Sequence, residues 1–214
     1  MNTIQLSGTL PHVFAERTDM KSEIWQQTVT LEKGKLYLVL ADSGTGKSSL
    51  LSYIYGYRQD YFGDILFDGE NIRDYNVARW TQLRRHHLSL LWQELRLFPE
   101  LTALENVEIK NRLTGFQSPQ QISAWFHQLG IADKQHSLVR NMSFGQQQRV
   151  AMIRTLCQPF DFLFIDEPIS HLDDANSIIM GEIIMHEARR QGAGVIATSI
   201  GKHIPLHYDQ CFRL

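Results

Sequence analysis

A glycine-containing loop between an apolar run and a helix start constrains the fold of this chain most. Residues 36–40 are apolar and predict a buried strand, while the pattern from Ser49 to Tyr53 predicts the first turns of a helix. A strand, a glycine-containing loop, Lys-Ser and a helix in this order predict a phosphate-binding loop. Its residues are Ala41, Asp42, Ser43, Gly44, Thr45, Gly46, Lys47 and Ser48.

The chemistry of phosphate binding explains why this loop needs these residue types. Gly44 and Gly46 let backbone N–H groups turn inward toward phosphate oxygens, and the start of the following helix adds a partial positive charge. Lys47 is expected to reach the β- and γ-phosphates of a nucleotide, and the Ser48 hydroxyl to bind Mg²⁺. Ala41, however, stands where the pattern has its first glycine, and a chance Gly-Lys-Ser turn is the alternative interpretation.

The composition restricts the class of protein. With 214 residues, of which 43% are hydrophobic, one globular domain is expected. A formal charge of −2 gives no electrostatic case for a nucleic-acid partner, and no apolar run approaches the length of about 20 residues that crosses a bilayer.

The start of the chain lacks the pattern of a signal peptide, and Cys157 and Cys211 do not make a disulfide framework, so a reducing cytoplasmic setting is expected. The adjacent His86 and His87 cannot share a helix face and are interpreted as surface residues rather than metal ligands.

Strands alternate with helices along the chain, which favours an α/β fold with a mostly parallel sheet. Predicted strands cover residues 4–6, 13–14, 24–31, 36–40, 63–69, 88–91, 160–165, 193–198 and 210–214. Predicted helices begin at 49 and cover 77–85, 102–113, 117–130, 145–157 and the stretch from 173 or 174 to 190. The stretch 98–140 has helical patterns only. We therefore expect one domain over residues 1–214, with a core of about 1–97 and 141–214 and an inserted helical sub-domain of about 98–140.

Two carboxylates follow one of the predicted buried strands. Asp166 and Glu167 end the apolar run of residues 162–165 and precede Pro168. Asp166 is expected to bind the same Mg²⁺ as Ser48, and Glu167 to polarise the attacking water, because phosphoryl transfer to water needs both a metal and a base. Taken alone, an Asp-Glu-Pro sequence is equally compatible with a solvated turn.

A second candidate anion site lies just before that strand. Ser143 and Gln146 form a capping box, which predicts the start of an ordinary helix. A helix N-terminus with a free hydroxyl also attracts anions, so both interpretations of this segment remain open.

These motifs together resemble the ATP-binding subunits of ABC transporters over nearly the whole chain. The family's motifs occur in its order: the loop 41–48, Gln93 after a strand, the signature at residues 142–146, the pair Asp166-Glu167, and residues 170–173. The amino-acid sequence of residues 97–107 is similar to that of the small subunits in the branch of the family for lipoprotein release, macrolide export and cell division. The resemblance implies a P-loop NTPase of ABC type with an N-terminal antiparallel β part, a mostly parallel core sheet and an inserted helical sub-domain.

The resemblance also implies a mechanism and partners. ATP and Mg²⁺ are the expected cofactors, with Gln93 near the metal and the attacking water. Two copies, or this chain and a paralogous subunit, would enclose two ATP molecules, each between the loop of one copy and Ser143, Gly145 and Gln146 of the other. Asp173 would lie at the dimer centre. A separate membrane permease would respond to the closure and opening of this dimer, which it would contact through a groove near Gln93 and the helical sub-domain. This contact would place the chain on the inner face of the membrane.

The sequence departs from the family at three positions. Ala41 and Phe144 replace glycines, and Ser199 stands where the family has a histidine that contacts the γ-phosphate. A serine offers only a short hydroxyl, so either turnover is slow or the chain is a partly degenerate ATP-gated clamp. His203 could substitute for the histidine, although nothing in the sequence places it.

Three further questions stay open at this point. Phe14, with Trp25 next, is expected to stack on adenine, although either side chain could equally belong to the core. A soluble ABC-type ATPase that acts on nucleic acid is a competing function, but the chain has one ATPase unit and no basic face. A regulatory ATP-binding module without turnover is another, and it would have no use for the carboxylate of Glu167.

Overall fold

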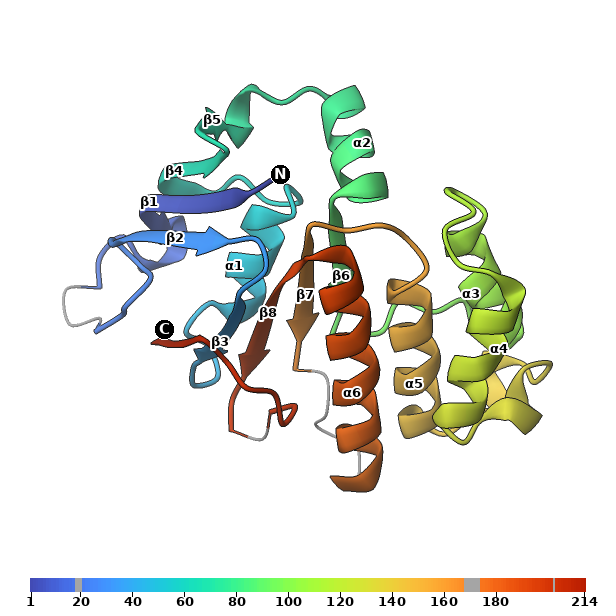
Figure 1. Cartoon of the computed structure of the whole chain (residues 1–214). Helices are drawn as coiled ribbons and strands as arrows, with labels where there is room; N and C mark the ends of the chain where they lie inside the picture. The colour runs from blue at the N-terminus through green and yellow to red at the C-terminus, as the bar shows by residue number, and fades with distance from the viewer. Residues whose placement is uncertain (18–20, 168–173, 202) are drawn as a thin grey trace.

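The computed structural model describes residues 1–17, 21–167, 174–201 and 203–214 and arranges them as two sheets with helices around them (Figure 1). The first sheet is antiparallel, with the strand order β2-β1-β4-β5. Its strands are β1 (Thr3–Pro11), β2 (Thr28–Glu32), β4 (Tyr61–Phe67) and β5 (Glu70–Asn71). The expected antiparallel β part at the N-terminus is therefore present.

The second sheet is parallel throughout its described strands, with the order β6-β7-β8-β3-β9. Its strands are β3 (Leu36–Leu40), β6 (Leu88–Leu91), β7 (Phe162–Asp166), β8 (Gly194–Ser199) and β9 (Gln210–Arg213). Because neighbouring strands run the same way, the carboxyl ends of β3, β7 and β8 meet at one edge, the lower edge in Figure 1.

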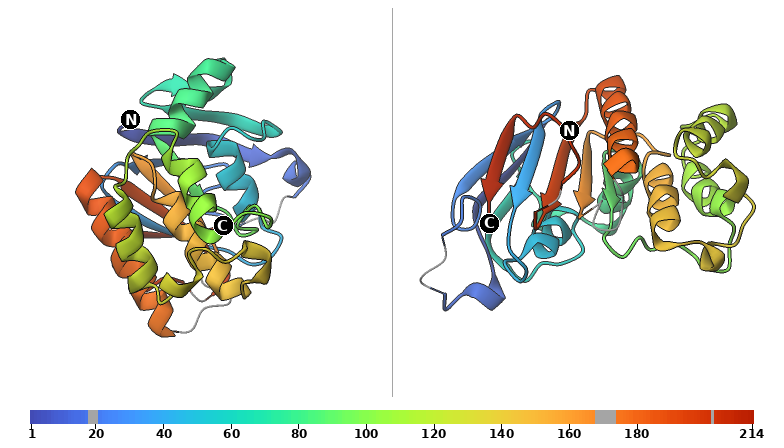
Figure 2. Two further views of the ribbon diagram at one scale, coloured as in Figure 1. Left: turned by 90° about the vertical axis from the view of Figure 1, so that its right-hand side faces the viewer. Right: turned by 90° about the horizontal axis from the view of Figure 1, so that it is seen from below.

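Helices cover both faces of the parallel sheet. They are α1 (Lys47–Ile54), α2 (Val77–His86), α3 (Ala103–Asn111), α4 (Pro119–Gln128), α5 (Phe144–Thr155) and α6 (Asp174–Gln191), with short 3₁₀ helices at His12–Phe14, Ile72–Asp74, Ala132–Lys134 and Val139–Asn141. In Figure 2 the helices 103–128 stand apart from the sheets, with α5 between them and the core. None of the helices in the described part of the chain combines the length and apolar character that crossing a bilayer would require.

The continuous apolar character of the parallel strands follows from burial on both faces. Along β7, Phe162 and Phe164 pack with α1 and the antiparallel sheet, while Leu163 and Ile165 pack with α5 and α6. The sheet thus separates two hydrophobic cores. It also holds the ends of β3, β7 and β8 rigidly, which suits a site built at that edge.

The helix starts follow the predicted capping signals. Thr102 and Glu105 form a capping box at α3, and Ser143 and Gln146 form another at α5. Ser118 caps α4, which has Pro119 in its first turn. Residues 98–140 form α3, α4 and two 3₁₀ helices, with a single β-bridge between Thr102 and Leu138. The division into core and helical sub-domain stays a prediction.

Two predicted strands are wrong or too long. Residues 12–14 form a 3₁₀ helix rather than a strand. The strand predicted over 24–31 begins only at Thr28, because the Ser22 hydroxyl accepts hydrogen bonds from the backbone N–H groups of Ile24 and Trp25 and so forms a turn. Ile24 and Trp25 are buried in the core, so their apolar character reflects burial rather than a strand. The short strand β5 was not predicted.

Candidate functional site

A cavity of about 560 Å³ lies at the edge where β3, β7 and β8 end. It brings together residues from five separate segments of the chain. Those that the sequence singled out are Phe14, Ser43, Gly44, Gly46, Lys47, Ser48, Ser49, Gln93 and Glu167. Val13, Arg17 and Ile200 complete the lining.

The loop between β3 and α1 has the backbone conformation that its glycines predict. Gly44 and Gly46 have φ values of +81° and +101°, in the left-handed region that side chains disfavour. A Cβ at Gly46 would also lie 3.1 Å from the rings of both Phe14 and Trp25. The Trp25 indole N–H donates to the carbonyl oxygen of Thr45 at 3.0 Å, so this tryptophan helps to hold the loop in its conformation.

The start of α1 is open to an anion. Gly46 is its N-cap and provides no side-chain hydrogen bond. In the described part of the chain, no acceptor pairs with the backbone N–H groups of Lys47, Ser48 or Ser49, while Leu50 N–H bonds to Gly46. These unsatisfied N–H groups and the helix dipole favour a negative charge at this point.

Lys47 is held inside the loop although it carries a charge. Its side chain is 6% exposed, and its Nζ donates to the carbonyl oxygens of Ala41 and Asp42 at 3.0 Å each. The same Nζ lies 3.4 Å from Oε1 of Glu167. These contacts satisfy a buried ammonium group, which would otherwise be costly.

Asp166 lies at the end of β7 among hydroxyl groups. Its Oδ2 accepts from Ser48 Oγ at 3.1 Å, and its Oδ1 accepts from Thr198 Oγ1 at 2.6 Å. Burial raises the pKa of the Asp166 carboxyl, and the two hydrogen bonds oppose that shift. A carboxylate and two hydroxyls are hard oxygen donors, so Asp166 and Ser48 fit a magnesium ion.

Glu167 occupies a strained backbone position next to the loop. Its φ is +46°, which is uncommon for a residue with a side chain. One carboxylate oxygen faces Lys47, and the other accepts a hydrogen bond from Nε2 of Gln93 at 3.3 Å. Gln93, which follows β6, and Glu167, which follows β7, therefore meet over the phosphate loop.

Ala41 and Ser199, which replace a glycine and a histidine of the family, have different structural surroundings. Ala41 does not adopt a left-handed backbone, and its N–H donates to the carbonyl oxygen of Ser199 at 3.0 Å, so a side chain is tolerated there. The Ser199 side chain is 1% exposed and its hydroxyl accepts from the Gly201 N–H at 2.9 Å. Ser199 does not line the cavity, whereas the next residue, Ile200, does.

His203 and Phe14 are two further candidates for the nucleotide site. His203 is exposed, contacts the carbonyl oxygen of Gly201 and packs against Tyr208. Phe14 is 4% exposed, and the Arg17 guanidinium covers its ring at 4.6 Å. Phe14 thus packs as a core residue beneath the loop. That it stacks on adenine stays a prediction.

The signature residues are not part of the cavity in this chain. Ser143 caps α5, its hydroxyl accepts from Gln146 N–H at 3.3 Å, and Gly145 lies in the first turn of the helix. Both α5 and α1 begin at the lower edge in Figure 1, and Phe144 is half-exposed there. Asp173 and the rest of residues 168–173 lie outside the described residues.

Sequence reasoning missed Thr198 and Ile200, and it named Trp25 as a candidate for adenine stacking without predicting its contact with the loop. Thr198 lies opposite Asp166 in the register of β7 and β8. The sequence does carry a signal for this contact, because two apolar runs that form parallel strands both end in polar residues. Trp25 carries no local signal, since its partner Thr45 is distant in the chain.

Comparisons with known proteins agree with this geometry. A profile of the ABC transporter family matches residues 25–170. The chain is 31% identical to the uncharacterized ABC transporter ATP-binding protein YclH of Bacillus subtilis and 29% identical to YbbA of Escherichia coli, with 87% of this chain and 83% of the relative covered in each case. The dimeric structure of MJ0796, a bacterial ABC transporter cassette, superposes with a TM-score of 0.77 at 23% identity and covers 92% of this chain and 88% of the other. The predicted ABC-type fold is thereby confirmed.

Proposed function

The chain belongs to the ABC transporter family, and on that premise we propose that it is the subunit that binds and hydrolyses ATP to power a separate membrane permease. One observation carries the proposal. Lys47, Ser48 and the Glu167–Gln93 pair line one cavity at the start of α1, and Ser48 donates a hydrogen bond to Asp166. This set provides a phosphate clamp, a place for a metal and a carboxylate base within reach of each other.

Each residue has a distinct part in the proposed reaction. The N–H groups at the start of α1 and the Lys47 ammonium bind the β- and γ-phosphates in place of the carbonyl and carboxylate contacts that Lys47 makes here. Ser48 and Asp166, which are hydrogen-bonded to each other, would hold Mg²⁺, and the metal would supply neutralisation of the phosphate charge. Glu167 accepts a hydrogen bond from the attacking water, and Gln93 keeps the Glu167 carboxylate oriented.

We propose that a second subunit, identical or paralogous, completes the site. Ser143, Gly145 and Gln146 lie outside the cavity of their own chain, so they reach a nucleotide only across an interface. A two-fold axis would place each α5 start against the loop of the other copy. ATP would favour the closed dimer because it contacts both surfaces only there.

The permease and the membrane location belong to the same proposal. Since the described chain has no helix suited to crossing a bilayer, a partner would have to provide the transport pathway. The segment after Gln93 borders the helical region 98–140. We propose that the permease binds in the groove between them and so holds the chain on the inner face of the membrane.

A partly degenerate clamp is the second candidate function. The observation that favours it is Ser199, which is buried away from the cavity and so leaves the γ-phosphate without the contact that a histidine would make. This candidate predicts ATP-dependent dimerisation with little phosphate release, whereas the first predicts both.

Glu167→Gln tests the proposal. The substitution keeps the shape of the side chain and removes the base, so we expect ATP and Mg²⁺ to trap a dimer visible by size-exclusion chromatography with light scattering. Phosphate release should fall by about 100-fold or more. Lys47→Ala is the matched control and should stay monomeric. A Glu167→Gln chain that binds ATP and remains monomeric would refute the sandwich dimer.

A further inference from the structure

The outer face of α6 carries one straight line of side chains. The buried residues of this helix recur every three or four positions and pack into the core. On the opposite side, Ile178, Glu182, Met185 and Arg189 follow one another at the spacing that places residues in a single line along a helix. None of the four is buried, and Ile178 is half exposed. We refer to these four residues as the outer stripe.

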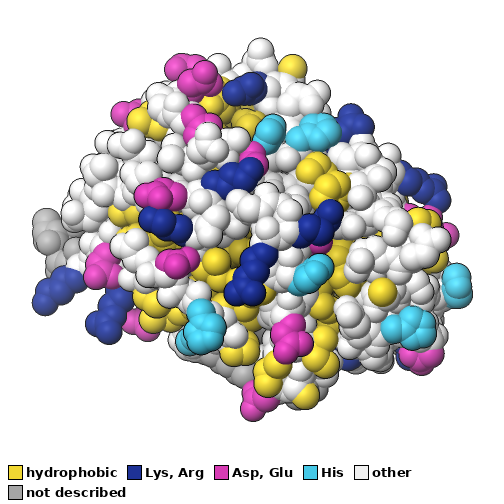
Figure 3. Space-filling view, in the orientation of Figure 1, with side chains coloured by type: hydrophobic (Ala, Val, Ile, Leu, Met, Phe, Trp, Pro, Cys, Tyr) yellow, Lys and Arg dark blue, Asp and Glu magenta, His cyan; other side chains and the backbone are white. Residues whose placement is uncertain are grey.

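A groove of about 750 Å³ runs beside the outer stripe and is lined by all four of its residues. Its other wall is the segment before β9, where Pro205, Leu206 and His207 lie. The two walls meet at Gly181, because a Cβ there would lie 2.9 Å from a methyl carbon of Ile204. Figure 3 shows this face of the molecule, with hydrophobic side chains over α6 between basic, acidic and histidine side chains. Apolar side chains exposed along one groove favour a surface that binds a partner.

The two charges of the outer stripe lack a counter-ion. Within the described part of the chain, neither Glu182 nor Arg189 forms an ion pair. The next residue, Arg190, differs, since its guanidinium donates two hydrogen bonds to the buried carboxylate of Glu187. The outer stripe therefore presents one carboxylate and one guanidinium to a partner, two helical turns apart.

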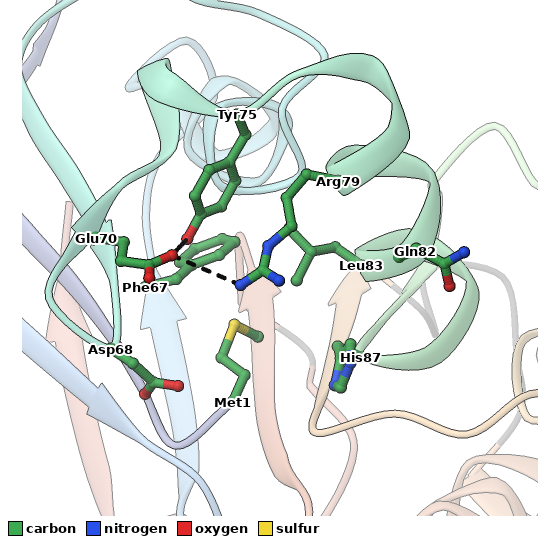
Figure 4. Close-up of a pocket in the computed structure, with 9 residues that line it drawn as sticks. All are labelled: Met1, Phe67, Asp68, Glu70, Tyr75, Arg79, Gln82, Leu83 and His87. Atoms are coloured by element: carbon green, nitrogen blue, oxygen red, sulfur yellow. Dashed lines mark hydrogen bonds and ion pairs between the residues drawn. The ribbon is translucent and has the colours of Figure 1, made fainter.

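The charges that line two other cavities are already accounted for. In the pocket drawn in Figure 4, Arg79 and Glu70 pair with each other at 3.6 Å. A cavity of about 270 Å³ gathers Arg96, Lys110 and Arg154 beside the segment that follows β6, so it belongs to the proposed permease contact.

We propose that a second copy of this chain packs on the outer stripe, with the two α6 helices antiparallel about a two-fold axis. Glu182 of each copy then faces Arg189 of the other, and the two Met185 side chains meet at the axis. Ile178 lies one turn from Glu182, where it packs on the methylene stem of the facing arginine. Because the contact is symmetric, the same ion pair forms twice.

The order of residues in the outer stripe favours a second copy over other partners. Read in the opposite direction, the stripe has arginine where glutamate stands and glutamate where arginine stands, with Met185 between them. It is therefore complementary to itself in charge, as an interface between identical copies requires. A surface of anionic lipids attracts clusters of positive charge, whereas the outer stripe carries both signs.

This contact is distinct from the proposed ATP sandwich. None of the residues of the outer stripe lines the nucleotide cavity, and the stripe does not include the start of α5. The inference therefore depends neither on ATP nor on a permease. Where both contacts form, they would join ATP sandwiches into an assembly of four or more chains.

Charge reversal tests the pairing. We expect the nucleotide-free chain to self-associate with a dissociation constant on the order of 10 μM, measured by sedimentation velocity. Glu182→Arg and Arg189→Glu should each weaken self-association by about tenfold or more, because each places like charges opposite one another. An equimolar mixture of the two variants should associate within about threefold of the wild type, because every facing pair in the mixed dimer has opposite charges.

Arg112→Glu is the matched control. This exposed arginine pairs with Glu108 within α3, away from the outer stripe, so its reversal should leave self-association unchanged. Thermal unfolding of the three variants should show that each remains folded. The mixing experiment is a second safeguard, since chains that fail to fold would not regain association when combined.

Three results would overturn the proposal. They are a wild-type chain that stays monomeric at about 200 μM, a dimer that persists unchanged in both variants, and variants that fail to associate when mixed. Binding of a monomeric wild type to phosphatidylglycerol vesicles that is lost in Arg189→Glu would assign the groove to lipid instead.

The ATP-trap assay with Glu167→Gln separates this proposal from the proposed function. It is run at about 1 μM, where the α6 contact does not form. An ATP-trapped dimer there, together with no self-association of the nucleotide-free chain, would refute only the α6 contact. Self-association without an ATP-trapped dimer would refute only the sandwich.

Discussion

Lys47 and Glu167 face each other across the phosphate loop, with the lysine Nζ 3.4 Å from the glutamate Oε1. Lys47 begins α1 and Glu167 follows β7, and both side chains are nearly buried. The residue proposed to bind phosphate and the proposed base are thus in direct contact. A phosphate that enters the loop would compete with Glu167 for Lys47 and release the carboxylate for water.

Lys47→Met is expected to abolish tight nucleotide binding. The variant keeps an apolar stem in the loop and removes the ammonium that contacts Ala41, Asp42 and Glu167. We expect the affinity for ATP with Mg²⁺ to fall by about 100-fold or more, on the order of 3 kcal/mol, measured by isothermal titration calorimetry. Lys35→Met, at an exposed lysine paired with Glu32, is the control. Unchanged affinity in Lys47→Met would remove the role assigned to the loop.

Histidine at position 200 should affect turnover more than histidine at position 199. The Ser199 side chain is buried and bonds to Gly201, so Ser199→His would crowd the core and lose a hydrogen bond. We expect its melting temperature to fall and phosphate release not to rise. Ile200 lines the cavity and is well exposed, so Ile200→His can reach the γ-phosphate and should increase phosphate release several-fold. A rise in Ser199→His alone would contradict this assignment.

Lys110→Met should stabilise the chain at neutral pH. The folded pKa of about 8 lies below the ordinary value of 10.5, so folding is penalised while both folded and unfolded chains are protonated, below pH 8. Burial and then the charge of Arg154 lower this pKa, while Cys157 opposes the shift. We expect a gain on the order of 2 kcal/mol at pH 7. The gain should shrink as the pH rises from about 8 through 10.5, measured by urea unfolding of both chains. A gain that does not change with pH would contradict the shifted titration.

Gly63→Ala should destabilise the antiparallel sheet strongly. Gly63 has a φ of +73°, and a Cβ would lie 2.4 Å from the carbonyl oxygens of Ser7 and Gly8, where the register of β1 against β4 shifts. The clash involves backbone atoms and cannot be relieved by a rotamer change, so we expect a loss of about 3 kcal/mol or more. Gly69→Ala is the control. It has a similar φ of +87° but open space around it, and should lose about 1 kcal/mol. Equal losses in thermal unfolding would show that φ alone accounts for the effect.

The fold could be predicted where the chain carries local signals. The apolar runs of β3, β6, β7 and β8, the loop glycines, and the caps at Thr102 and Ser143 all appear where the sequence places them. Residues 13–14 and 24–27 were misassigned because apolar residues such as Phe14, Ile24 and Trp25, which are buried beneath a loop, have the same local pattern as a short strand. Strand Glu70–Asn71 is too short to produce a pattern.

The sequence by itself determined the phosphate loop, the Asp166–Glu167 pair and the membership of the ABC transporter family, because each depends on residue types at fixed spacing along the chain. Tertiary structure alone decided that Thr198 bonds to Asp166, that Ile200 rather than Ser199 lines the cavity, and that Trp25 supports the loop. It also decided that Arg96, Lys110 and Arg154 share one groove. These relationships join residues brought together only by the packing of strands and helices, and the burial that gives Lys110 its unusual pKa exists only once that packing has formed.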